Sequence, residues 1–245
     1  PKNIGNFQSD YYRRLAFDEI LASMLISSEI RKKIKRIKKK NKIFTNDESK
    51  IILNNLDFEL TNDQKKALNE INIDLKSKNK MFRLLQGDVG SGKTIVSLIS
   101  ALNVVKSHYQ VALMAPTEIL AKQHYDLAKK LFPKNIEINI LSGKTETKQK
   151  NIIYEKIKNG EIKMIFGTHT LFQKKINFKN LGYIIIDEQH KFGVKQRKNL
   201  SDKGGSNCDV LLMSATPIPR TLIMSIYGDM DISIIREKPK NRKNV

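Results

Sequence analysis

From about residue 58 onward, short apolar runs alternate with longer stretches of helical periodicity. The cores of the runs are apolar without a break, as in Ile184–Ile186 and Val210–Met213, a pattern typical of strands that are buried on both faces. Strands are predicted at Phe82–Gln86, Val111–Ala115, Ile136–Leu141, Met164–Gly167, Tyr183–Asp187 and Val210–Ser214. Helices are predicted to begin at Gly92, Thr117 and Thr147 and near Pro219. This alternation predicts an α/β domain with a parallel sheet and helices on both of its faces.

The N-terminal part of the chain has a different pattern. Apolar residues recur at near-helical spacing between Tyr11 and Ile30 and continue into a basic run, Arg31–Lys40. We therefore expect one long helix from Tyr11 to Lys40, whose cationic C-terminal end suits the helix dipole. The basic run has two interpretations, a solvated helix face or a contact with nucleic acid. Residues 46–60 start with polar residues and are predicted to form a linker.

Composition narrows the class of protein. Of the 245 residues, 40% are hydrophobic and 29% are charged, which is typical of a folded globular chain. The formal net charge of +20 has two sources in our interpretation. One is a general preference for lysine, and the other is a basic surface for nucleic acid, whose phosphates release counterions when they are neutralised.

The cysteine count, the apolar stretches and the first residue lead to expectations about the cellular compartment and about the length of the full polypeptide. The single cysteine, Cys208, excludes an internal disulfide and a multi-cysteine metal site, and fits a reducing, cytoplasmic compartment. We expect neither a transmembrane helix nor a secretory signal, because no apolar stretch has the length or the flanks of either. The chain does not begin with Met, and we expect it to be part of a longer polypeptide.

The clearest motif is the glycine-rich segment Gly87-Asp88-Val89-Gly90-Ser91-Gly92-Lys93-Thr94. It matches the phosphate-binding loop G-x-x-x-x-G-K-[ST], and it lies between a predicted strand and a predicted helix, as such a loop must. Glycines let backbone N–H groups surround an anion, and the helix N-terminus adds positive potential. Lys93 is predicted to reach the β- and γ-phosphates of a nucleotide, and Thr94 to bind Mg²⁺.

A pair of acidic residues, Asp187-Glu188, follows the predicted strand at Tyr183. An isolated pair of this kind is usually surface charge. At the carboxyl end of a parallel strand, downstream of a phosphate loop, it predicts a hydrolytic site. Asp187 is expected to hold Mg²⁺, and Glu188 to orient the attacking water and accept its proton.

A third segment, Ser214-Ala215-Thr216-Pro217-Ile218-Pro219-Arg220-Thr221, also follows a predicted strand. Its hydroxyl groups are candidates for sensing the γ-phosphate, and its prolines predict a stiff turn. Without the other two motifs, an ordinary turn between a strand and a helix would be the preferred interpretation.

Together these motifs resemble the first motor domain of superfamily-2 DNA helicases, and more narrowly the RecG family. The resemblance rests on the phosphate loop, Met114–Glu118, Gly167-Thr168-His169, Asp187–Val194 and Thr216–Thr221. It implies a RecA-like P-loop NTPase domain that uses ATP and Mg²⁺ to drive a DNA helicase acting on stalled forks and branched DNA. The transcription-repair coupling family shares the segment around Asp187 but has Glu at the position of Gln189, so the RecG family is preferred.

The resemblance also implies roles for individual residues. Gln64 would hydrogen-bond the adenine edge, and Phe58 would pack nearby. Pro116-Thr117 and Gly167-Thr168 match segments that hold the DNA backbone, which positions DNA without recognising its sequence. His190 and the segment Ser214-Ala215-Thr216 match the relay between nucleotide state and DNA binding. Gln189 and Arg220 belong to the same group of residues expected in DNA contact and coupling.

The sequence therefore predicts three parts. Residues 1–57 would be a helical connector from an upstream wedge domain, residues 58–236 the ATP-binding domain, and residues 237–245 the start of a linker to a second motor domain. We expect DNA as the partner, without sequence specificity, and a monomer. Three alternatives remain open: the motor of a transcription-repair coupling translocase, a nucleotide-gated DNA-binding module without turnover, and a purely structural basic domain. The carboxylate Glu188 argues against a module without turnover, and the phosphate loop argues against a purely structural domain.

Overall fold

The apolar runs form one seven-stranded sheet in the computed structural model, which describes residues 10–45, 47–143, 145–173, 175–188, 205–215 and 230–237. All strand pairs are parallel, and the order across the sheet is β3-β4-β2-β5-β6-β1-β7. The strands are β1 (Phe82–Gly87), β2 (Gln110–Met114), β3 (Ile138–Leu141), β4 (Met164–Gly167), β5 (Leu181–Ile186), β6 (Asp209–Ser214) and β7 (Asp231–Ile235). This arrangement confirms the predicted RecA-like α/β fold.

The predicted strands are all present, with ends that differ by one or two residues at most. The edge strand β7 was not predicted. Its sequence, Asp-Ile-Ser-Ile-Ile, has no continuous apolar core, and only two of its five residues are buried. It pairs with β1 alone, so it lacks the two-sided burial that makes the central strands recognisable.

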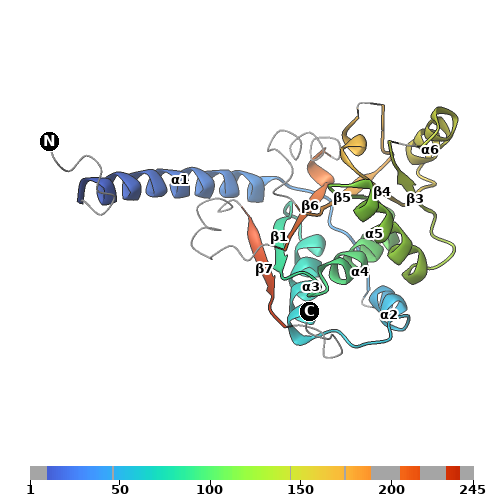
Figure 1. Cartoon of the computed structure of the whole chain (residues 1–245), viewed down its shortest axis with the longest axis horizontal. Coiled ribbons are helices and arrows are strands. Elements are labelled where there is room, and N and C mark those ends of the chain that lie inside the picture. Colours follow the sequence, from blue (N-terminus) through green and yellow to red (C-terminus); the bar gives the residue numbers. More distant parts are fainter. Residues whose placement is uncertain are drawn as a thin grey trace.

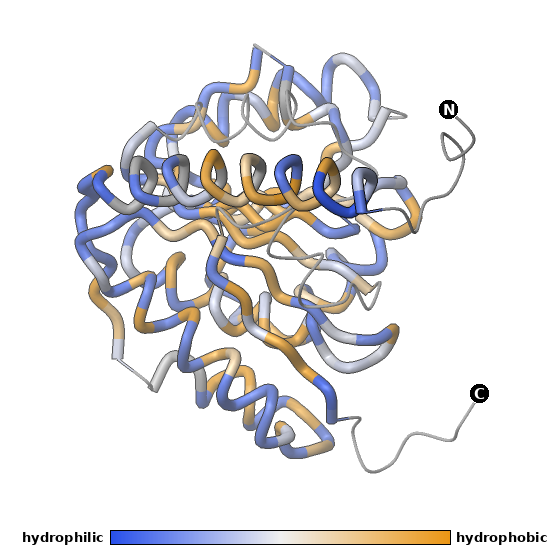
Figure 2. The backbone as a smooth tube through the Cα atoms, turned by 90° about the vertical axis from the view of Figure 1, so that its left-hand side faces the viewer, coloured by the Kyte–Doolittle hydropathy of each residue, from blue (hydrophilic) through white to orange (hydrophobic). Residues whose placement is uncertain are grey.

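Helices cover both faces of the sheet, as predicted. One face packs against α3 (Asn62–Lys76), α4 (Lys93–Lys106) and α5 (Glu118–Leu131), and the other face packs against α6 (Thr147–Asn159). Alternate strand residues serve the two cores: Ile185 belongs to the first, and Ile184 and Ile186 to the second. Figure 2 shows hydrophobic residues concentrated on the central strands. The helix expected near Pro219 lies outside the described residues.

The N-terminal helix α1 (Asp10–Arg36) extends away from the sheet domain (Figure 1). Most of its large apolar side chains are exposed: Tyr11, Leu15, Phe17, Ile20, Leu21, Met24, Leu25 and Ile26. The expectation that the helix continues to Lys40 was wrong. After Arg36 the backbone pairs with the chain leading into β1, because Lys80 N donates to Ile37 O and Lys39 N donates to Lys78 O. Among the helices of the described ranges, none has the length and apolarity needed to cross a membrane.

The segment expected to be a linker contains a short helix, α2 (Asp47–Leu53). Ile52 is fully buried in the first core, and Phe44, just before the helix, is buried in the same core. The polar residues at 46–49 suggested a linker, but the apolar run Ile51–Leu53 packs against that core. The segment between α1 and α3 is therefore part of the packed sheet domain.

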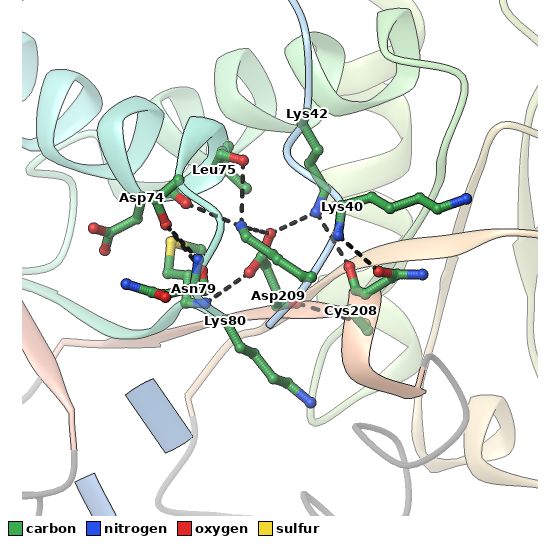
Figure 3. Close-up of polar contacts among 12 residues, drawn as sticks. Lys40, Lys42, Asp74, Leu75, Asn79, Lys80, Cys208 and Asp209 are labelled. Carbon is green, nitrogen blue, oxygen red and sulfur yellow. Dashed lines mark hydrogen bonds and ion pairs between the residues drawn. The ribbon is translucent and has the colours of Figure 1, made fainter. Parts of the chain in front are cut away.

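The basic run is not a uniformly solvated face. The side chains of Lys39 and, just beyond the run, Lys42 are buried, and both contact the carboxylate of Asp209 at the start of β6. Figure 3 shows this cluster, which joins the segment after α1 to the amino edge of the sheet. Lys32, by contrast, remains on the exposed surface of α1.

Candidate nucleotide-binding site

The phosphate loop connects β1, which ends at Gly87, to α4, which begins at Lys93. Gly90 and Gly92 have φ angles of 77° and 89°, a left-handed conformation that glycine adopts without a steric cost. At Gly92 a Cβ atom would also collide with the side chain of Gln64. Glycine is therefore required by the backbone at these two positions of the loop.

The ammonium group of Lys93 lies inside the loop. Its Nζ donates to the carbonyl oxygens of Gly87 at 2.6 Å and Asp88 at 2.9 Å. Burial lowers the pKa of Lys93 below its ordinary value, and the carboxylates of Asp187, Glu188 and Asp88 partly offset this effect. A buried cation bound to neutral carbonyl groups is well suited to accept an anionic ligand, because a phosphate would replace weak partners with a charge-assisted hydrogen bond.

Ser91 supplies a second sign of a ligand site. Its Oγ is buried and has no hydrogen-bond partner among the described residues. A buried hydroxyl without a partner carries a free-energy cost, and a phosphate oxygen at the N-terminus of α4 would supply the missing partner. The loop therefore fits the phosphates of a nucleotide.

The acidic pair lies at the carboxyl end of β5, two strands from β1 in the sheet. The carboxylate of Asp187 is mostly buried, and its Oδ2 lies 2.8 Å from Nε2 of His124. Glu188 has a φ angle of 48°, which a residue with a side chain rarely adopts and which is typical of functional sites. Asp187 and Thr94 carry hard oxygen atoms of the kind that Mg²⁺ prefers, and their role as metal ligands stays a prediction.

Gln64 lies beside the phosphate loop. Its side chain is fully buried, and its Nε2 donates to Ser91 O at 2.8 Å while its Oε1 accepts from Thr61 N at 2.9 Å. These contacts join the N-terminus of α3 to the loop. The predicted contact with adenine stays a prediction, as does the role of Phe58, whose side chain is exposed.

The two segments predicted to hold DNA lie on neighbouring strands. Met114 pairs with Gly167, and Ala115 N donates to Gly167 O at 2.9 Å, so Pro116-Thr117 lies beside Gly167-Thr168. Thr117 caps α5, where its Oγ1 accepts from Leu120 N. The side chain of Thr168 is buried, so the backbone of that segment is better placed than the hydroxyl for an external contact.

The predicted coupling residues are described only in part. Ser214 is buried at the carboxyl end of β6, on the same edge as the phosphate loop. Gln189, His190, Thr216 and Arg220 lie outside the described residues, and their roles stay predictions.

His124 was missed by the sequence analysis. It occupies the buried face of α5 together with Ala121, Ala128 and Leu131. A histidine at helical spacing among apolar positions was the available signal, because a buried imidazole needs a hydrogen-bond partner. The sequence alone did not identify that partner, which lies 63 residues further along the chain.

Comparison with known proteins agrees with this geometry. The sequence profile of the DEAD/DEAH box helicase family matches residues 61–224. The ATP-dependent DNA helicase RecG of Aquifex aeolicus is 48% identical over all of this chain and 32% of its own length, and RecG of Borreliella burgdorferi is 52% identical over 78% of this chain and 28% of its own length. The chain thus spans about a third of the curated relatives it matches. These matches confirm the resemblance to the RecG family.

Solved structures give the same result. RecG bound to a three-way DNA junction superposes with a TM-score of 0.83 at 40% identity, covering 95% of this chain and 31% of that one. The DEAD-box helicase Mss116, at 20% identity and a TM-score of 0.60 over 80% of this chain and 44% of that one, shares the fold.

Proposed function

The chain belongs to the DEAD/DEAH box helicase family, and from this premise we propose that it is the first motor domain of an ATP-dependent DNA helicase of the RecG type. The observation that supports this most directly is the loop at the N-terminus of α4, which contains the buried Lys93 and a buried Ser91 hydroxyl that has no hydrogen-bond partner in the described part of the chain. The negative charges of Asp187 and Glu188 raise the pKa of that lysine and so oppose the lowering caused by burial. The groups to which we assign phosphate binding and hydrolysis come from one edge of the sheet, and this supports the proposal.

Each group has a role in ATP hydrolysis. Lys93 and the loop N–H groups hold the β- and γ-phosphates, while Thr94 and Asp187 hold Mg²⁺. The metal supplies charge neutralisation at the phosphates when it is bound. Glu188 orients a water molecule and accepts its proton, and Gln64 and Phe58 bind the adenine side of the nucleotide. A base at position 188 favours turnover over a nucleotide-gated module that never hydrolyses its ligand.

The partner we propose is branched DNA, held without sequence specificity, and the process is the remodelling of stalled forks in DNA repair and recombination. The support is the similarity to RecG, one of whose structures contains a three-way DNA junction, together with the adjacent segments at Thr117 and Thr168. A second motor domain in the same polypeptide would complete the site, because an arginine finger contributes about 10³–10⁵ in rate in related enzymes. We propose that the protein acts as a monomer in the cytoplasm.

Replacement of Lys93 by Ala tests the nucleotide site. Titration calorimetry with Mg²⁺ and a non-hydrolysable ATP analogue is expected to show an affinity loss on the order of 100-fold, because a buried charged partner of the phosphates is removed. The matched control is Lys106→Ala, at the other end of the same helix, which should bind like the wild type. Equal affinity in Lys93→Ala and wild type would contradict the assignment.

A further inference from the structure

His124 has an unusual place for a buried residue. It lies on α5, the helix that Thr117 caps, and its side chain is only about one tenth exposed. Its Nε2 is 2.8 Å from Oδ2 of Asp187, which directly follows β5 at the carboxyl edge of the sheet. The imidazole therefore contacts the carboxylate to which the proposed function gives the metal.

The direction of this hydrogen bond follows from chemistry. An ionised carboxylate only accepts hydrogen bonds, so Nε2 of His124 must carry the hydrogen and donate it. The other oxygen, Oδ1, accepts from the backbone N–H of Glu188 at 3.0 Å. Both oxygens of Asp187 are held in this way, and each keeps a lone pair for a further contact.

The neighbouring polar groups differ from His124 in how they contact Asp187. The lysine of the phosphate loop donates to the carbonyl oxygens of Gly87 and Asp88 and so leaves the orientation of the Asp187 carboxylate to other groups. The backbone N–H of Glu188 belongs to a residue in the left-handed conformation, next to the carboxylate itself. The hydrogen bond from His124 comes instead from a packed helix, and it links the Asp187 carboxylate to the body of the domain.

We propose that His124 is a positioning residue for Asp187, which orients the carboxylate so that it can hold Mg²⁺ beside the phosphate loop. This proposal rests on the proposed function, because it concerns the same site. Removal of a group that hydrogen-bonds a metal ligand without touching the metal typically lowers metal affinity or activity by about 10–100-fold. His124 would contribute to metal binding without touching the metal or the nucleotide.

The test is a Mg²⁺ titration monitored by the binding of a fluorescent ATP analogue, which requires no turnover. In His124→Leu, which keeps comparable bulk but has no donor, the Mg²⁺ concentration for half-maximal binding is expected to rise about 10–100-fold. In His124→Gln, whose amide nitrogen reaches about as far as Nε2, it should stay near the wild-type value. Nucleotide binding in excess EDTA should be equal in all three proteins, because the phosphate loop is intact.

Each outcome has a distinct meaning. If His124→Leu has the Mg²⁺ dependence of the wild type, or if His124→Gln is as impaired as His124→Leu, the positioning role is wrong. If binding in EDTA falls as much as binding in Mg²⁺, His124 supports the fold alone and the proposal is also wrong. If His124→Leu does not fold, His124→Asn replaces it, since its amide is too short to reach Asp187 and it should show the same rise. A wild type whose nucleotide binding ignores Mg²⁺ would overturn the metal role in the proposed function as well.

Discussion

The two edges of the sheet both bury lysine near a carboxylate, but they differ in how completely their polar atoms are paired. At the amino edge, where the strands begin, Asp209 is the first residue of β6. Its carboxylate contacts Lys39 and Lys42. At the carboxyl edge, Lys93 lies near Asp187 and Glu188. Both edges thus combine lysines with carboxylates, but the hydrogen bonds of these groups differ between the two edges.

The amino edge is closed. Oδ1 of Asp209 accepts from Met81 N at 2.7 Å, and Oδ2 accepts from both lysines (Figure 3). Lys39 also donates to the carbonyl oxygens of Asp74 and Leu75, and Lys42 to that of Asn207. Burial lowers the pKa of Lys39, and Asp209 opposes this shift. The protein thus supplies partners to both oxygens of Asp209 and to both ammonium groups, as expected for a structural ion cluster.

The carboxyl edge is open. Lys93 donates to backbone carbonyl groups rather than to a carboxylate, Ser91 Oγ has no partner among the described residues, and Glu188 has a left-handed backbone. This combination of a buried Ser91 hydroxyl without a partner in the described ranges and a left-handed backbone at Glu188 is costly in a folded protein. It is consistent with an edge that receives a ligand, and this difference between the edges predicts different consequences for mutations.

The largest effect is expected at the open edge, for Glu188→Gln in a polypeptide that includes the proposed second motor domain. Because an amide cannot accept the proton of the attacking water, ATP turnover should fall about 10²–10⁴-fold. Nucleotide affinity should stay unchanged. A steady-state ATPase assay with DNA measures the turnover, and calorimetry measures the nucleotide affinity. Glu161→Gln, on the exposed surface after α6, is the control, and near wild-type turnover by Glu188→Gln would show that another residue is the base.

At the closed edge, Asp209→Asn is expected to reduce the free energy of unfolding by about 3–5 kcal/mol, because it leaves two buried lysines without a counter-charge. Urea denaturation measures this loss. The exposed Asp126 provides the control, Asp126→Asn, which should be neutral.

The triple variant Asp209→Leu, Lys39→Met, Lys42→Met sharpens the same comparison. Replacing a whole buried ion cluster by apolar residues is often neutral or stabilising, so this variant should recover most of the lost stability. An Asp209→Asn variant as stable as the wild type, or one that loses nucleotide affinity while folded, would contradict the division between the edges.

The two edges were also unequally predictable from sequence. The phosphate loop is contiguous, and its glycines, Lys93 and Thr94 are constrained by local backbone geometry, so a short pattern sufficed. The contact between Lys39 and Asp209 joins residues 170 positions apart, and no local pattern reveals such a partner. Lys39 therefore resembled its exposed neighbours in the basic run. His124 was missed for the same reason, since its partner lies 63 residues further along the chain. The strand β7 was missed because it pairs with β1 alone and has no continuous apolar core.

The smallest effect is expected for Lys32→Ala, which contrasts with Lys39 within one basic run. The ammonium of Lys32 pairs with Glu29 at 2.9 Å, but both side chains are more than half exposed. Exposed pairs of this kind contribute little to stability, so urea denaturation should show no measurable change. The salt dependence of DNA binding, measured by fluorescence anisotropy, then distinguishes the two interpretations of the run. If the slope of log K against log salt concentration is smaller in magnitude by about 0.9 in Lys32→Ala, Lys32 contacts a phosphate. An unchanged slope identifies a solvated face. A clear loss of stability in Lys32→Ala would mean that α1 packs its charged surface against another part of the protein, and exposure would no longer separate Lys32 from Lys39.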